Sequence, residues 1–200
     1  QKYWTIEAEF DNGGNHYQGK WFLQDGKNKE KQIFDEKRAK QIVKGCMGKN
    51  AVIEETTAPA FQKCGALYDL TTLQREANNR FGFSASTTLS IAQALYERHK
   101  ATTYPRTDSR CLPEDYIAPV KKTLANMTGP VEKFAKEVLE NSWVKKNPKV
   151  FDNTKISDHF AIIPTGVMPK NLTEAEQKIF DMSCQRFVAV FYPPAKFRNT

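Results

Sequence analysis

Apolar and polar positions divide the chain into a first part with strand-like alternation and a longer second part with helical spacing. Residues 3–10 alternate imperfectly between the two classes, Gly13-Gly14-Asn15 supplies a turn, and residues 19–23 are again extended in character. Adjacent glycines between two such stretches are typical of a β-hairpin. The opening of the chain is therefore predicted to be mainly β.

One helix is expected within this first part. Asp35 is placed to cap a helix over residues 36–44, and Gly45 follows as its stop. Residues 51–55 are predicted to be extended, and residues 56–59, which include a proline, break that pattern.

The next stretch has the start and stop signals of a helix. Asp69 or Thr71 can cap a helix that runs to Arg80. Thr71 and Gln74 have the spacing of a capping box, and Gly82 follows as the stop.

Three-residue and four-residue spacing then predicts three more helices. Ser86 can cap the first, whose buried face would hold Leu89, Ala92, Leu95 and Tyr96. The second covers residues 130–141, with one apolar side made of Val131, Phe134, Val138 and Leu139. A polar loop is expected at residues 143–155. Thr173 and Glu176 form a capping box for a last helix through Val190, which Pro193-Pro194 ends.

The order of these elements predicts an α+β fold, with residues 1–68 mainly β and the chain from residue 69 mostly helical. The apolar share of 40% and the charged share of 26% suit a packed core and exclude a disordered segment. The net charge of +7 favours a polyanionic partner, although many basic domains bind no nucleic acid. The first residue is Gln1 and not Met, which suggests a piece of a longer protein.

Cysteine spacing and hydropathy exclude several classes of protein. Cys46, Cys64, Cys111 and Cys184 form no CxxC pair, so neither a zinc site nor a dense disulfide framework is indicated, and buried, reduced thiols are expected. No apolar run approaches the length of a membrane helix, and no signal-peptide layout is present. We therefore expect a cytoplasmic protein with no membrane partner.

Basic residues gather around one tyrosine on the short, irregular connection that follows the helix capped by Ser86. Tyr104 lies in a segment that contains Asp108 and four cations, namely Arg98, Lys100, Arg106 and Arg110. This surplus of three positive charges would attract a phosphate backbone. The alternative is a solvated basic loop with an ordinary half-buried aromatic ring, and composition alone favours that alternative.

A tyrosine can conserve the energy of a phosphodiester bond by holding the phosphate covalently after the strand is cut. A phenol with an ordinary pKa near 10 is almost fully protonated at neutral pH, so such chemistry needs a cation that stabilises the phenolate. Arg106, two residues beyond Tyr104, could supply that charge and also clamp the phosphate through paired hydrogen bonds.

Four ordered blocks identify a family. They read DLTTLQREANNRFGFS at 69–84, AQALYE at 92–97, TYPRTDS at 103–109 and SDHFAIIPT at 157–165. Together they closely resemble type IA DNA topoisomerases. The proline after the tyrosine, the IIPT ending, the opening YWTIEAEF and the closing FYPPAKF resemble the topoisomerase III branch. The resemblance covers essentially the whole chain.

The resemblance implies a β-rich arch or hinge domain at 1–68, completed by 192–200, and a mostly helical catalytic-tyrosine domain at 69–191. It implies three catalytic residues: Tyr104 forms a 5′-phosphotyrosyl bond, Arg106 stabilises phosphate and phenolate, and His159 lies near the cleaved strand. We expect DNA contacts from Arg98, Lys100, Asp108 and Arg110, with Asp108 orienting Arg106 or a neighbouring group. Chemistry alone would make His159 a structural or surface histidine.

The same resemblance implies an enzyme that cleaves one strand, passes another and reseals the first, without consuming a nucleoside triphosphate. Mg²⁺ would be held by a Toprim domain, and this chain has no acidic cluster to represent that domain, so no cofactor or metal ligand is expected here. Expected partners are DNA, single-stranded at the cleavage site, the other domains of the protein, and a helicase as a candidate. A bacterial, nucleoid-associated location is expected.

Several assignments stay open. Cys111 stands where the family often has an aromatic residue, a difference expected to adjust packing alone. His16 and His99 match no block and are expected at the surface, whereas Phe81, Phe83 and Tyr96 are expected in the core although they could stack on bases. Two other functions are considered: a non-catalytic module that binds single-stranded nucleic acid, and a structural or partner-binding domain.

Overall fold

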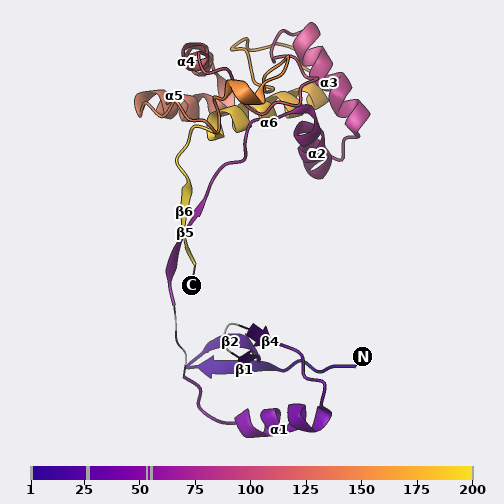
Figure 1. Ribbon diagram of the computed structural model, residues 1–200, viewed down its shortest axis with the longest axis vertical. Coiled ribbons are helices and arrows are strands. Elements are labelled where there is room, and N and C mark those ends of the chain that lie inside the picture. The colour runs from indigo at the N-terminus through magenta and orange to yellow at the C-terminus, as the bar shows by residue number, and fades with distance from the viewer. Residues whose placement is uncertain (1, 26–27, 53, 55, 200) are drawn as a thin grey trace. The chain divides into compact units, whose positions relative to one another are not determined.

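The chain forms two compact units in the computed structural model, which describes residues 2–25, 28–52, 54 and 56–199 (Figure 1). Contacts between Cα atoms divide the chain after Thr57, so one unit ends there and the other covers Ala58–Asn199. The division therefore falls eleven residues before position 68, the last residue of the predicted β-rich domain.

The first unit contains two hairpins and one helix. The strands are β1 (Glu7–Asn12), β2 (Asn15–Lys20), β3 (Leu23–Asp25) and β4 (Asn28–Glu30). The first hairpin is the predicted one. Its turn consists of Gly13 and Gly14, both at positive φ, a backbone conformation in which glycine has no steric penalty.

Helix α1 (Glu36–Cys46) begins where the sequence predicts, because the Asp35 carboxylate accepts a 2.8 Å hydrogen bond from the amide of Lys37. The predicted stop was wrong: Gly45 lies inside the helix. Among the described residues of this unit only Ile33 and Ala39 are buried apolar residues, so its core is small.

The second unit begins with a strand that the sequence pattern did not predict. Strand β5 (Ala58–Gln62) pairs antiparallel with β6 (Ala195–Asn199), side by side in Figure 1. Pro59 is tolerated because a two-stranded ribbon has free edges. The extended prediction at 51–55 includes Ile53 and Glu55, which lie outside the described residues; no strand is assigned to the others.

Five helices and two short 3₁₀ turns follow β5. The helices are α2 (Leu70–Phe81), α3 (Ala85–Glu97), α4 (Ile117–Ala125), α5 (Glu132–Glu140) and α6 (Glu174–Ala189). The turns cover Gly129–Val131 and Asn153–Lys155. The sequence pattern did not predict α4, which is short and begins without a side-chain cap.

The caps of these helices partly match the prediction. Asp69 and Thr72 form the capping box of α2, so the predicted box of Thr71 and Gln74 was wrong, whereas Gly82 ends the helix at φ +72° as expected. The N-cap of α3 is Ser84 and not Ser86. The capping box of Thr173 and Glu176 on α6 is confirmed.

The core of the second unit lies around α6, which packs against α3 and α5 (Figure 1). Phe187, Leu95 and Val138 each have essentially no exposed surface. On α5 the predicted apolar side was partly wrong, since Phe134 is 49% exposed while Ala135 is buried. In the described part of the chain no helix is long and apolar enough to cross a membrane.

The four cysteines are free thiols, but only two are buried. Cys111 and Cys184 lie in the interior, and burial raises the pKa of the Cys184 thiol to about 12. Cys46 and Cys64 are exposed, so the expectation of four buried thiols was wrong for this pair. The four cysteines lie far apart in the sequence, and no local signal predicts which of them are buried.

A buried carboxylate joins α6 to the end of α3. The Glu176 side chain is 5% exposed and bonds the guanidinium of Arg98, while His99 Nε2 lies 3.4 Å from the same carboxylate. His99 is 14% exposed, so its predicted surface position was wrong; His16, at 60%, is exposed as predicted. The hydrogen bond from the Thr173 amide, with the charge of Arg98, lowers the pKa of Glu176 to about 2.

Replacement of this carboxylate should remove a pH-dependent part of the stability. The lowered pKa means that ionised Glu176 stabilises the fold above its ordinary pKa of 4.5 and loses that effect as the pH falls toward 2. Glu176→Gln should cost about 1–3 kcal/mol at pH 7 and flatten the dependence in acid. Urea unfolding across a pH series measures both. Glu174→Gln, on the exposed side of α6, is the control, and equal effects would contradict the prediction.

Candidate active site

Two segments that lie far apart in the sequence pair to form the site. Residues 101–107 run antiparallel to residues 159–165: the amide of Thr103 bonds the carbonyl of Ile163 at 2.9 Å, and the amide of Thr165 bonds that of Ala101 at 3.0 Å. Lys100, at φ +53°, turns the chain out of α3 into this pairing. The segment that carries Tyr104 is therefore held along its length by the segment that carries His159.

Threonine hydroxyls complete this pairing. Thr103 Oγ1 donates to the carbonyl of Ala161 and accepts from the amide of Ile163, both at 2.9 Å. Thr107 Oγ1 donates to the carbonyl of His159 at 2.9 Å, which fixes the backbone that carries the histidine. Each hydroxyl thus satisfies main-chain groups that the irregular backbone would otherwise leave unpaired.

Tyr104 contacts two other rings. Its centroid is 4.2 Å from that of His159, with the planes tilted by 41°. Tyr96 of α3 makes an edge-to-face contact with it at 5.4 Å and 81°, and Lys100 Nζ lies 5.8 Å from the Tyr96 centroid. Tyr104 is half-buried while His159 is exposed, so the phenol is restrained but open to a large substrate.

Arg106 is exposed, but its guanidinium is anchored. With the amide oxygen of Gln93 turned toward it, that oxygen accepts from Arg106 Nε at 3.2 Å and from Nη2 at 3.0 Å. Gln93 lies on α3, one turn before Tyr96. The helix that supports the tyrosine ring therefore also supports the arginine.

The other predicted residues have contacts of different kinds. Asp108 Oδ1 accepts from Ser157 Oγ at 3.3 Å, a neighbouring group, and no contact with Arg106 is found in the described part of the chain. Arg110 Nε donates to the carbonyl of Leu67 at 3.2 Å. Arg98 is engaged with Glu176. Tyr104 and His159 are thus in contact, Arg106 is held by the helix that also contacts Tyr104, and Arg98 and Arg110 make structural contacts.

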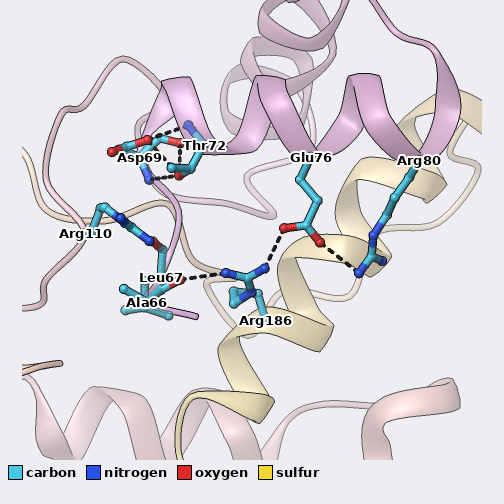
Figure 2. A network of polar contacts seen from close by, with 8 residues as sticks. All are labelled: Ala66, Leu67, Asp69, Thr72, Glu76, Arg80, Arg110 and Arg186. Carbon is cyan, nitrogen blue, oxygen red and sulfur yellow. Dashed lines mark hydrogen bonds and ion pairs between the residues drawn. The ribbon is translucent and has the colours of Figure 1, made fainter. Parts of the chain in front are cut away.

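A network of polar contacts anchors the chain on its way from β5 into α2 (Figure 2). Arg186 of α6 donates to the carbonyl of Ala66 at 2.9 Å and to Glu76 Oε2 at 2.5 Å, and Glu76 Oε1 also pairs with Arg80 at 2.8 Å. The Arg186 guanidinium lies 4.5 Å from the centroid of the Tyr68 ring. Burial, with the Glu76 carboxylate, raises the pKa of Tyr68.

This anchored segment bonds directly to the two segments of the site. The amide of Ile162 bonds the carbonyl of Tyr68 at 2.8 Å, and the amide of Leu70 bonds the carbonyl of Thr107 at 3.0 Å. Backbone and side-chain contacts therefore connect α2 and α6 to the loop of Tyr104.

The available groups suit nucleophilic attack on an anion, with a phenol, a guanidinium and an imidazole together. A metal ion is not accommodated by the part of the chain that the structure describes, where no three acidic, histidine or cysteine side chains are grouped to hold one.

Sequence reasoning missed two residues of the site. Tyr96 was expected in the core and instead contacts Tyr104, and Gln93 was given no role. Both belong to the AQALYE block, and their three-residue spacing places them on one helix face. The sequence carries no signal that this face meets a loop ten residues further on.

Comparisons with known proteins agree with this architecture. A family model described as DNA topoisomerase matches residues 1–200. DNA topoisomerase 3 of Bacillus subtilis is 39% identical over 181 residues, covering 88% of this chain and 25% of that protein. DNA topoisomerase 3 of Bacillus cereus is 40% identical over 203 residues, covering 100% and 27%. This chain thus spans about a quarter of the length of the curated relatives it matches.

A solved structure shows the same fold. Full-length topoisomerase I from Thermotoga maritima matches with a TM-score of 0.61 at 24% identity, over 98% of this chain and 30% of that one. The family model, the named relatives and the shared fold lead to one assignment. The chain belongs to the DNA topoisomerase family, among its type IA members.

Proposed function

We propose that the chain supplies the tyrosine half of the strand-cleavage site of a full-length DNA topoisomerase. The Tyr104 oxygen attacks a backbone phosphorus, a phosphorus–oxygen bond forms to the phenol, and the bond to the 3′ oxygen of the neighbouring nucleotide breaks. The phenol proton is lost and the leaving oxygen gains one. The product is a 5′-phosphotyrosyl bond, and reversal of the same step reseals the strand.

The observation that carries this proposal is the grouping of Tyr104 with Arg106 and His159. Arg106 is exposed and anchored, so it can meet a phosphate without first losing much conformational freedom. Its fixed charge would offset the negative charge that builds on the phosphate and the phenol oxygen in the transition state. The ring of His159 lies against Tyr104 and is open to the bound strand.

Between cleavage and resealing, movement of the unit that holds Tyr104 would carry the bound end and open a gate for another strand. The result would be relaxed or decatenated DNA, with no nucleoside triphosphate consumed. A Mg²⁺ requirement would rest on residues outside this chain, because the described residues do not fit a metal ion.

Tyr104→Phe in the full-length protein should abolish the covalent adduct with single-stranded DNA, because the new side chain has no nucleophilic oxygen. Denaturing gels of a 3′-labelled oligonucleotide would measure the adduct. Tyr17→Phe, an exposed tyrosine of β2, is the matched control and should leave the adduct unchanged. Normal adduct from the Tyr104 variant would rule out the assigned nucleophile.

The 200-residue chain alone should bind single-stranded DNA without relaxing supercoiled plasmid. Binding should weaken as salt rises, because phosphate contacts release counterions. Fluorescence anisotropy across a salt series and a plasmid assay with Mg²⁺ measure the two properties. Salt-independent binding would favour a structural or partner-binding domain, and robust relaxation would show that the chain holds a complete site.

A further inference from the structure

We propose that Gln93 and Tyr96 of α3 are positioning residues for cleavage: Gln93 orients the Arg106 guanidinium and Tyr96 holds the ring of Tyr104. This inference rests on the proposed function of Tyr104. Neither residue is proposed to contact DNA or the reacting atoms. Each acts through the side chain that it touches.

Gln93 determines which edge of the guanidinium remains free. Its amide oxygen accepts from Nε and Nη2 of Arg106, at 3.2 and 3.0 Å. A guanidinium has five N–H donors, so three remain, on Nη1 and the outer side of Nη2. A phosphate would therefore be bound by the terminal pair of nitrogens, and the direction of approach is set by α3.

The neutral amide of Gln93 is important for this role. A carboxylate at the same position would accept the same two hydrogen bonds but would also cancel the charge of Arg106. An amide oxygen holds the guanidinium and leaves its positive charge available to the phosphate. Substitutions at Gln93 can therefore test the position of the Arg106 guanidinium and its charge separately.

Tyr96 limits the orientations open to the Tyr104 ring. The Tyr104 ring packs edge-to-face on Tyr96 at 5.4 Å and also contacts the His159 ring at 4.2 Å, and both contacts restrict its rotation. A nucleophile held in one orientation loses less entropy when it reaches the phosphorus. The Tyr96 contact is made by the ring, so its hydroxyl is not required for this role.

Helix α3 is rigid enough to serve as the support. Its N-cap hydroxyl on Ser84 bonds the amide of Thr87 at 3.0 Å, and Ala92 and Leu95 are buried in the core. Gln93 and Tyr96 are neighbours at three-residue spacing beside that buried stripe. The same helix turn therefore packs on the core and carries both supporting side chains.

The test for Gln93 uses single-turnover cleavage of a single-stranded oligonucleotide by the full-length protein at saturating DNA. Gln93→Leu removes the acceptor at similar size and should slow cleavage about 10-fold to 100-fold, the effect of one or two hydrogen bonds to a charged group. Gln93→Glu should also slow cleavage, because the acceptor is kept but the charge is cancelled.

The test for Tyr96 separates the ring from its hydroxyl. Tyr96→Phe should cleave at close to the normal rate, whereas Tyr96→Ala should be slower by about tenfold, since loss of the aromatic pair frees the nucleophile. DNA affinity should change little in Gln93→Leu, Tyr96→Phe and Tyr96→Ala. Two variants serve as controls. Gln185→Leu, at an exposed position of α6, is the size control for Gln93→Leu. Phe83→Ala, at a half-buried ring beside Phe81, is the control for the packing lost in Tyr96→Ala.

Two outcomes would overturn this inference. One is cleavage by Gln93→Leu and Tyr96→Ala at the rates of their controls. The other is slow cleavage that matches an equal loss of thermal stability or of DNA affinity. Adduct formation at Tyr104 by the unmodified protein is scored in the same experiment. If that adduct is absent the proposed function fails, and if it is present while the variants behave as controls, only the positioning roles fail.

Discussion

The antiparallel pairing of residues 101–107 with residues 159–165 is the constraint on which the candidate site depends. Thr103 and Ile163, 60 positions apart, exchange hydrogen bonds through a backbone amide and a hydroxyl. Closing a loop of that length has an entropic cost, which the surrounding helical core must offset. Because Tyr104 and His159 lie on the two paired segments, their rings meet only when this pairing forms. The chemistry is therefore coupled to the packing of the whole second unit.

The positive charge of the chain is divided between structure and site. Arg186 binds Glu76 and a main-chain carbonyl with 19% of its side chain exposed, and Arg98 binds the buried Glu176. The Arg186 pair is well desolvated on both sides and contributes more than exposed surface pairs, which are typically worth under about 1 kcal/mol, whereas the Arg98 side chain is 65% exposed and only its partner Glu176 is buried. Arg106 differs, since its anchor is a neutral amide. The net charge of +7 therefore overstates how many cations are available to DNA.

The features that the sequence predicts well are those that depend on neighbouring residues. The caps at Asp35 and Thr173 were predicted because a cap needs only a side chain and an amide two or three residues on. The N-cap of α3 was assigned to Ser86 and not to Ser84, because both serines lie at the start of the helix, where their hydroxyls are within hydrogen-bonding distance of each other. Strand β5 was missed because its partner lies more than 130 positions away. For the same reason the family blocks identify Tyr104 and His159 as important residues but do not show that their rings touch.

The packing of the second unit fits the proposed mechanism of a strand gate. A gate opens only if the two ends of the cut strand are held by bodies that can separate. In this chain the phenol that would hold one end lies on a unit that is held together by the contacts of Arg186, by the paired segments and by α3. In the proposed mechanism the groups that act on the other end lie on a separate body. Placing both sets of groups on one rigid unit would favour cleavage and resealing but would leave no path for a second strand.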